Sequence, residues 1–160
     1  MFRQNGMMAN HSTYRDTPPS PGPAQSYQRV PLRKRRCFLF VQQKGVRQVM
    51  AHFILQAVKP KDEGPDYDNR AVQRIRTGVT ASKKVGNAVA RNRAKRRMRA
   101  LFRLFSQTDF PGSDWQADYV LVARHSLVTA RWDELKADFH KAAETVNKKL
   151  SHSGIQERRP

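Results

Sequence analysis

The residues with the clearest chemical potential are the basic side chains of segment 80–103. No aspartate or glutamate occurs anywhere from Asn69 to Thr108. The basic residues of the segment are Lys83, Lys84, Arg91, Arg93, Lys95, Arg96, Arg97, Arg99 and Arg103. Guanidinium and ammonium groups bind phosphate oxygens, and a segment of one charge sign repels itself unless it meets a polyanion. The pattern therefore favours nucleic-acid binding.

The spacing of apolar residues predicts that these cations stand on an amphipathic helix. Its apolar stripe is Ala90, Ala94, Met98, Leu101 and Phe105, with Phe102 at the margin. Its opposite face is Asn92, Lys95, Arg96, Arg99 and Arg103. Arg91, Arg93 and Arg97 fall on the flanks, where we expect their charged heads to point outward beyond apolar stems. Asn87 is the predicted N-cap.

A solvated helix face is the ordinary explanation of charged residues, but it usually contains both signs. Here no acidic residue lies three or four positions from the cations, so helix-stabilising pairs do not explain them. Phosphate contacts would set affinity and register without reading base sequence. Nucleic-acid binding is therefore the stronger interpretation.

Composition gives the same indication for the whole chain. The 160 residues carry a net charge of +18 and a pI of about 11.1, which points to nucleic acid or an acidic membrane surface. The sequence shows neither an apolar run that could span a bilayer nor the apolar core of a signal peptide, so we expect a cytoplasmic protein. Cys37 is the only cysteine and is expected to be a buried small residue.

The remaining elements predict one domain between two tails. Residues 1–30 are expected to form a disordered, proline-rich tail, 31–150 the RNA-binding domain, and 151–160 a flexible C-terminal tail. Helices are predicted at Leu32–Gln43, ended by Gly45, and at Trp132–Leu150; strands are predicted at Val49–Val58, Ala71–Ser82 and Asp118–His125. The order indicates an α+β fold, a two-layer sandwich of a small, mostly antiparallel sheet and three helices.

Two further charged groups have alternative interpretations. The cluster Arg33, Lys34, Arg35 and Arg36 is either a solvated helix start or a second RNA contact. The loop Lys59–Arg70 collects Asp62, Glu63, Asp66 and Asp68, which we attribute to solubility rather than to a catalytic metal. His52 is expected to be an edge or cleft residue, because no second histidine or cysteine lies at metal-ligand spacing.

The segment K-K-V-G-N-A-V-A-R-N-R-A-K-R-R-M-R, residues 83–99, resembles the signature of the protein subunit of bacterial ribonuclease P. Its core R-N-R is Arg91-Asn92-Arg93. The likeness continues in R-T-G-V-T-A-S-K-K before the segment and in A-D-Y-V-L-V-A-R after it, and it covers about Leu32 to Leu150.

The resemblance implies that an RNA subunit carries the catalytic centre and that the protein assists removal of the 5′ leader from precursor tRNA. The implied RNA-facing residues are Lys83, Arg91, Asn92, Arg93, Lys95, Arg96 and Arg99, and the basic pattern adds Lys84 and Arg103. The family also implies a left-handed crossover through the basic helix and a leader cleft lined by Phe38. Where relatives often have further cleft aromatics this chain has Gln42 and Gln56, and Phe40 or Phe53 could substitute.

The expected partners are the catalytic RNA and precursor tRNA, with no membrane and no obligatory protein partner. Phosphodiester hydrolysis usually needs metal ions, and the basic segment has no grouped carboxylates to hold them. We therefore expect no catalytic residue and no metal ligand in this chain, with Mg²⁺ held by the RNA. The alternatives are a noncatalytic ribosomal or chaperone-type RNA-binding protein, a DNA-recognition helix, which the following strand argues against, and a metal nuclease using the acidic loop.

Overall fold

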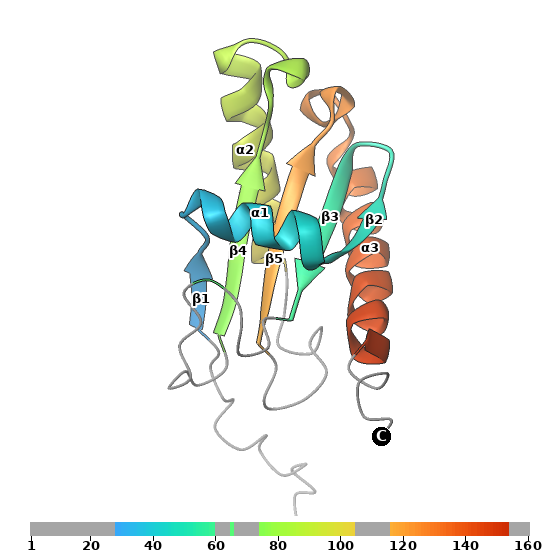
Figure 1. Ribbon diagram of the computed structural model, residues 1–160. Coiled ribbons are helices and arrows are strands. Elements are labelled where there is room, and N and C mark those ends of the chain that lie inside the picture. The colour runs from blue at the N-terminus through green and yellow to red at the C-terminus, as the bar shows by residue number, and fades with distance from the viewer. Residues whose placement is uncertain (1–27, 60–64, 66–73, 105–115, 154–160) are drawn as a thin grey trace, which may run out of the picture.

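A central sheet separates one helix from two others (Figure 1). The computed structural model describes residues 28–59, 65, 74–104 and 116–153. Within them α1 (Arg35–Lys44) covers one face of the sheet, and α2 (Ala88–Arg103) and α3 (Trp132–Ser153) cover the other. The predicted α+β class with three helices is confirmed. The layers number three rather than two, because α1 has an apolar cluster of its own.

The sheet has five strands in the order β1-β4-β5-β3-β2. Their bounds are β1 Gln28–Pro31, β2 Val46–Val49, β3 Phe53–Val58, β4 Arg74–Thr80 and β5 Ala117–Ala123. The pairs β1–β4 and β4–β5 are parallel, whereas β3–β5 and β2–β3 are antiparallel. The sheet is therefore mixed, whereas the sequence predicts a mostly antiparallel one.

Two strands were not predicted, and each has a local reason. β1 begins at Gln28, inside the segment 1–30 that is predicted to be a tail, and ends at Pro31; its proline and short length conceal the strand pattern. The backbone N–H of Leu32 continues this strand by donating to the Thr77 carbonyl at 2.8 Å, so α1 starts at Arg35 and not at Leu32. The predicted strand Val49–Val58 contains β3 and the tight turn before it, which has neither glycine nor proline; the strand β2, which pairs with β3 in a hairpin, begins earlier at Val46.

The other boundaries lie close to prediction. Gly45 ends α1, and its N–H donates to the Val41 carbonyl at 2.9 Å. α3 continues to Ser153, three residues beyond the predicted domain end at 150. Residues 1–27, the acidic residues Asp62, Glu63, Asp66 and Asp68, and the C-terminal residues from 154 lie outside the described residues. No helix of the described part combines the length and apolar character needed to cross a bilayer.

The connection from β4 through α2 to β5 has the unusual hand that the family resemblance implied. β4 and β5 are parallel neighbours, with Ile75 opposite Ala117 and Thr80 opposite Val122. In Figure 1 both strands run upward, β5 lies to the right of β4, and α2 lies behind the sheet. This arrangement is a left-handed crossover, whereas nearly all such connections are right-handed.

The larger core lies between the sheet and the helix pair α2 and α3. The Phe139 ring of α3 is its centre, edge-on to Phe102 of α2 at 5.8 Å and 6.4 Å from Phe53 of β3, measured between ring centroids. Each such side chain contributes about 1.5–3 kcal/mol by leaving water. The buried Tyr119 hydroxyl is 2.6 Å from Oδ1 of Asn147, which satisfies both groups.

The smaller core lies under α1, where Cys37 and Val41 pack with Leu32, Val58 and Val120. Cys37 is buried as predicted. Beside it Arg76 of β4 forms a paired hydrogen bond with Asp118 of β5, Nε to Oδ1 at 2.6 Å and Nη2 to Oδ2 at 2.5 Å. Burial raises the pKa of the Asp118 carboxyl, and the Arg76 guanidinium opposes that shift. Arg76 therefore stabilises the charged form of Asp118.

We predict that Asp118→Ala lowers the free energy of unfolding by about 3–5 kcal/mol, because it leaves the Arg76 guanidinium buried without its counter-charge. Urea denaturation measures this loss. Asp133→Ala is the matched control, because Asp133 pairs with Lys136 on the exposed surface of α3 and such pairs contribute at most about 1 kcal/mol. Equal small losses for both variants would show that the buried pair does not hold β4 to β5.

Candidate nucleic-acid interface

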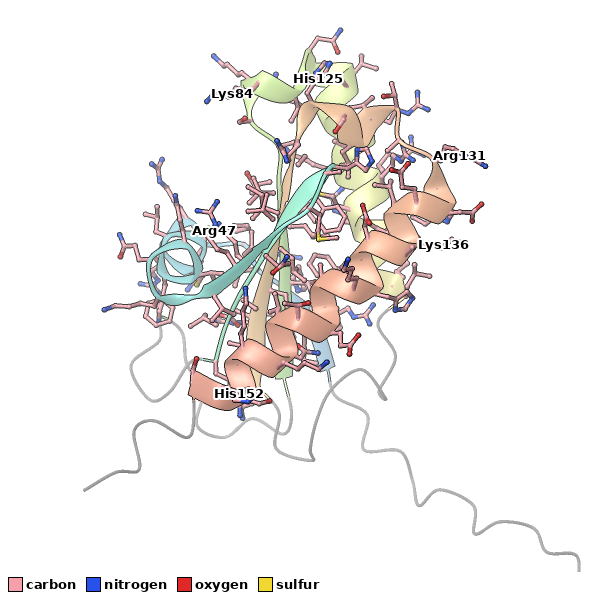
Figure 2. All side chains as sticks on the ribbon, turned by 90° about the vertical axis from the view of Figure 1, so that its right-hand side faces the viewer. Arg47, Lys84, His125, Arg131, Lys136 and His152 are labelled. Atoms are coloured by element: carbon pink, nitrogen blue, oxygen red, sulfur yellow. The ribbon has the colours of Figure 1, made fainter. Side chains whose placement is uncertain are left out.

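The entrance to α2 is fixed by two local interactions. Asn87 caps the helix as predicted, its Oδ1 accepting from the N–H of Ala90 at 2.9 Å. Gly86 before it has a φ of 143°, which residues with a side chain rarely adopt. The short turn η1 (Lys83–Val85) precedes it, and the His125 ring Nδ1 lies 2.9 Å from the Val85 carbonyl oxygen. Lys83 and Lys84 of this turn are exposed. Figure 2 shows Lys84 beside the start of the helix.

α2 buries one face and exposes the other, as its periodicity predicted. Ala94, Met98, Leu101 and Phe102 are buried. Of the predicted RNA contacts on α2, those exposed are Asn92, Arg93, Arg96, Arg99 and Arg103. Arg91 and Lys95 are half-buried, and the buried Nε of Arg91 has no hydrogen-bond acceptor among the described residues. Phe105, predicted for the apolar stripe, lies outside the described residues.

Arg97 differs from the other flank arginines, because its head points inward and not outward. It donates from Nη1 to the carbonyl oxygens of Leu127 and Val128 at 2.8 and 2.7 Å, and from Nη2 to the carbonyl of Ala130. Burial lowers its pKa, and the charge of Arg93 lowers it further. Arg97 therefore fastens α2 to the turn η3 (His125–Val128) and is not available to a ligand.

The exposed cations of α2 are not neutralised within the described part of the chain. The ion pairs formed there join His52 to Glu134, Arg76 to Asp118, Lys136 to Asp133 and Lys148 to Glu144. None of them includes a residue of α2. A rigid row of guanidinium groups without counter-charges suits an anionic polymer.

A groove lies between α1 and the sheet, and it contains the predicted cleft residue Phe38. We call it the α1 groove; it is lined by Arg33, Arg35, Phe38, Gln42, Arg47, Ile54, Gln56, Val79, Thr80, Ala81, Lys95, Val120 and Val122. Lys95 reaches it from α2, and Arg47 of β2 borders it on the side of α1 (Figure 2). An aromatic ring, aliphatic walls and four basic side chains are what unpaired bases and their phosphates require.

Gly78 explains how Phe38 lies against the sheet. A Cβ built at this glycine would be 2.6 Å from Cε1 of the Phe38 ring, closer than carbon atoms approach. Only glycine therefore lets the ring rest on β4. Gln42 and Gln56, which occupy the positions of expected aromatics, line the same groove. Phe38 is consequently the one aromatic side chain lining the groove among the described residues.

The assignment of Phe53 to the cleft is wrong. Phe53 is wholly buried on the opposite face of the sheet, where it packs near Phe139. The alternation of β3 explains this, because Ile54 and Gln56 face the α1 side while Phe53 and Leu55 face the larger core. Phe40, the other proposed substitute, is half-buried against the smaller core and does not line the groove.

His52 is held between two protein groups. Its Nδ1 lies 2.9 Å from the Ser126 hydroxyl and its Nε2 lies 3.1 Å from Oε1 of Glu134. Asp138 is near enough that the ligand atoms of His52, Glu134 and Asp138 lie within 4.8 Å of one another. Because the ring is satisfied on both sides, we assign it a structural role that joins the β2–β3 turn to α3, in place of the predicted edge or cleft position.

Comparison with known proteins gives a consistent result. The sequence model of the family Ribonuclease P matches residues 27–147, which begins one residue before β1. The ribonuclease P protein component of Ruegeria pomeroyi is 44% identical over 112 residues, covering 69% of this chain and 81% of the relative. That of Caulobacter vibrioides is 35% identical over 125 residues, covering 78% of this chain and 76% of the relative.

Solved structures share the fold. The RNase P protein of Staphylococcus aureus superposes with a TM-score of 0.55 at 20% identity, covering 72% of this chain and 93% of its own. The RNase P protein of Thermotoga maritima gives 0.55 at 22% identity, with 72% and 96% covered. These structures confirm the arrangement of sheet and helices around α2.

We predict that substitution of Arg97 destabilises the fold, whereas substitution of its neighbour Arg96 does not. Arg97→Ala should lower the free energy of unfolding by about 2–3 kcal/mol, because it removes the charged donor and leaves two backbone carbonyl oxygens without their hydrogen bonds. Arg96→Ala should change it by less than about 0.5 kcal/mol, because the side chain is exposed. Urea titration of both variants tests this. A large loss of unfolding free energy for Arg96→Ala would show that the exposed face of α2 stabilises the fold.

Proposed function

The chain belongs to the ribonuclease P family of protein components, and on that premise we propose that it binds the catalytic RNA subunit and the 5′ leader of precursor tRNA. In this role it assists the endonucleolytic cut that produces the mature 5′ end of tRNA. The observation that carries the proposal is the face of α2 without counter-charges, which lies beside a groove lined by Phe38. We assign the assembly to the cytoplasm, where tRNA precursors of a bacterium are made.

The α2 face would reduce repulsion between two RNA polyanions. Arg93, Arg96 and Arg99 are exposed on a helix whose start is capped by Asn87 and which Arg97 holds to the rest of the fold. The backbone therefore loses little conformational freedom when these side chains bind phosphate. Each contact releases counterions, so affinity should fall steeply with salt, by roughly a few hundredfold between 50 and 200 mM for about five contacts. The protein thereby lets the RNA subunit hold its substrate at cellular salt.

The α1 groove would hold the leader without reading its sequence. The face of the Phe38 ring can stack on any base, and Arg35, Arg47 and Lys95 at the rim can meet the phosphates. Gln42 and Gln56 add amide hydrogen bonds where a further ring would add stacking. Leaders that differ in sequence could therefore use the same groove.

The chemistry of bond cleavage would belong to the RNA. Among the described residues no carboxylate lines the α1 groove, and none lies on the exposed face of α2. These residues do not fit a Mg²⁺ ion, which prefers carboxylate and phosphate oxygens. We therefore propose that RNA phosphates hold the divalent ions and that this chain contributes binding and orientation.

The decisive assay is leader cleavage by the RNA subunit at low Mg²⁺ with and without the protein. We expect the protein to raise the rate and lower the Mg²⁺ requirement, because it supplies cations that otherwise come from the buffer. A general RNA chaperone should not reproduce this stimulation and serves as the control. Cleavage by the protein alone, or no effect on the RNA, would contradict the proposal.

We predict that Phe38→Ala weakens binding of precursor tRNA by about fivefold or more, because base stacking on an aromatic ring contributes about 1–3 kcal/mol. Binding of mature tRNA should remain unchanged. Phe40→Ala is the matched control, because Phe40 is a half-buried phenylalanine of the same helix that lies outside the groove. If precursor and mature tRNA weaken equally, the groove does not bind the leader.

A further inference from the structure

Three side chains that can bind a metal ion meet where the turn between β2 and β3 reaches α3. Figure 1 shows this turn beside the start of α3. The turn contributes the imidazole of His52, and the helix contributes the carboxylates of Glu134 and Asp138. One ligand atom of each side chain lies within 4.8 Å of those of the other two. We call this group the His52 cluster.

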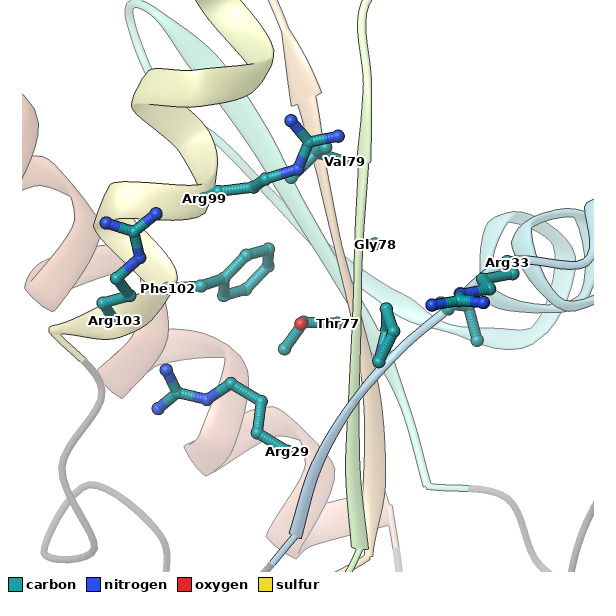
Figure 3. Close-up of a pocket in the computed structure, with 10 residues that line it drawn as sticks. Arg29, Arg33, Thr77, Gly78, Val79, Arg99, Phe102 and Arg103 are labelled. Atoms are coloured by element: carbon teal, nitrogen blue, oxygen red, sulfur yellow. The ribbon is translucent and has the colours of Figure 1, made fainter.

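The His52 cluster is an exception on a strongly basic protein, whose net charge is +18. The hollow between β1 and α2, for example, is bordered by Arg29, Arg99 and Arg103 and would repel a metal ion (Figure 3). In the cluster, by contrast, two carboxylates stand one helical turn apart on α3. Like charges at this spacing destabilise a helix, and a divalent cation between them would remove the repulsion.

The neighbouring residue Ser126 determines which nitrogen of the His52 ring carries a proton. Ser126 donates its single hydroxyl proton to the Ala51 carbonyl oxygen at 3.3 Å. The Ser126 oxygen therefore accepts from the Nδ1–H of His52, which is 2.9 Å away. In the neutral ring Nε2 then has a lone pair, and it faces the carboxylate oxygen Oε1 of Glu134 at 3.1 Å. Two acceptors in such contact need a cation between them, either a proton on Nε2 or a metal ion that both of them bind.

Asp138 distinguishes between these two cations. A proton on Nε2 of His52 makes one hydrogen bond, and Glu134 accepts it. The Asp138 side chain is half-buried, and in the part of the chain that the structure describes it forms neither a hydrogen bond nor an ion pair. A metal ion binds several ligands at once, so it would engage the Asp138 carboxylate together with the other two groups. The arrangement of all three side chains therefore favours a metal ion over a proton.

The types of ligand indicate which metal. Imidazole and carboxylate groups bind Zn²⁺ at about 2.0–2.2 Å, so two ligands of one tetrahedral ion lie roughly 3.4 Å apart. The 3.1 Å between Nε2 of His52 and Oε1 of Glu134 is close to that spacing. A histidine that binds a metal also usually donates its other ring N–H to a neighbouring group, as Nδ1 does to Ser126. Mg²⁺ prefers oxygen ligands alone, so the imidazole disfavours it.

We infer that the His52 cluster binds one divalent transition-metal ion of the Zn²⁺ type, through Nε2 of His52 and the carboxylates of Glu134 and Asp138. The sequence predicts no metal ligand in this chain, because His52 and Glu134 are 82 positions apart and form no local motif. The ion would join the β2–β3 turn to α3. Its role is structural, because the cluster lies outside α2 and outside the α1 groove, and it is separate from the Mg²⁺ ions that we assign to the RNA.

The full chain is compared with the variant Asp138→Asn, which keeps the shape of the side chain and removes its charge. Asp133→Asn is the matched control, because Asp133 is an exposed aspartate of the same helix outside the cluster. Zn²⁺ binding is measured by isothermal titration calorimetry, with Mg²⁺ titrated in parallel. The ring nitrogens of His52 are followed by ¹H–¹⁵N NMR, in which His52→Gln identifies their signals and so separates this site from other histidines. Thermal melting is recorded for each variant without metal.

We expect Zn²⁺, but not Mg²⁺, to shift the Nε2 signal of His52 while Nδ1 keeps its proton. Asp138→Asn should weaken Zn²⁺ binding at this site by at least about tenfold, whereas Asp133→Asn should bind like the wild type. Without metal, Asp138→Asn should melt like the wild type, because the Asp138 carboxylate has no hydrogen bond to lose. If Zn²⁺ leaves the His52 signals unchanged, or if Asp138→Asn binds Zn²⁺ as well as Asp133→Asn does, the cluster is a hydrogen-bonded ion pair and not a metal site.

Discussion

The structure depends on stabilising α2, a helix whose exposed surface carries positive charge only. Self-repulsion along α2 must be offset by what the helix buries, namely the stripe of Ala94, Met98, Leu101 and Phe102 against the sheet and α3. Arg97 adds hydrogen bonds to this packing, because its guanidinium donates to three backbone carbonyls in and after η3. The anchoring is therefore concentrated on one face, which leaves the other face free to display cations at fixed positions.

The topology then determines what lies beside those cations. A right-handed crossover between β4 and β5 would have placed α2 on the face that α1 occupies. The left-handed connection places it on the opposite face and along the edge of β4, where Lys95 reaches the α1 groove. Gly78 allows the Phe38 ring to lie against that same strand. A single strand of the sheet thus brings together the aromatic surface and the row of cations.

Much of this arrangement could be predicted from sequence, and the errors have physical reasons. Asn87 as a cap, the buried stripe of α2 and the buried Cys37 depend on local patterns that tertiary structure did not override. The direction of Arg97 depends on carbonyls thirty residues away, and the strand β1 depends on pairing with β4, so neither has a local signal. Phe53 was misplaced because β3 is apolar on both faces, and only the register shows which face meets α1.

The central claim is that the outer face of α2 binds RNA phosphate and does not stabilise the fold. The most direct measurement is the salt dependence of binding to the RNA subunit for the wild type and for a variant with Arg93, Arg96 and Arg99 changed to glutamine. The account predicts a slope of log affinity against log salt that is smaller by about three, with an unchanged melting temperature. An unchanged slope, or a variant that no longer folds, would contradict it.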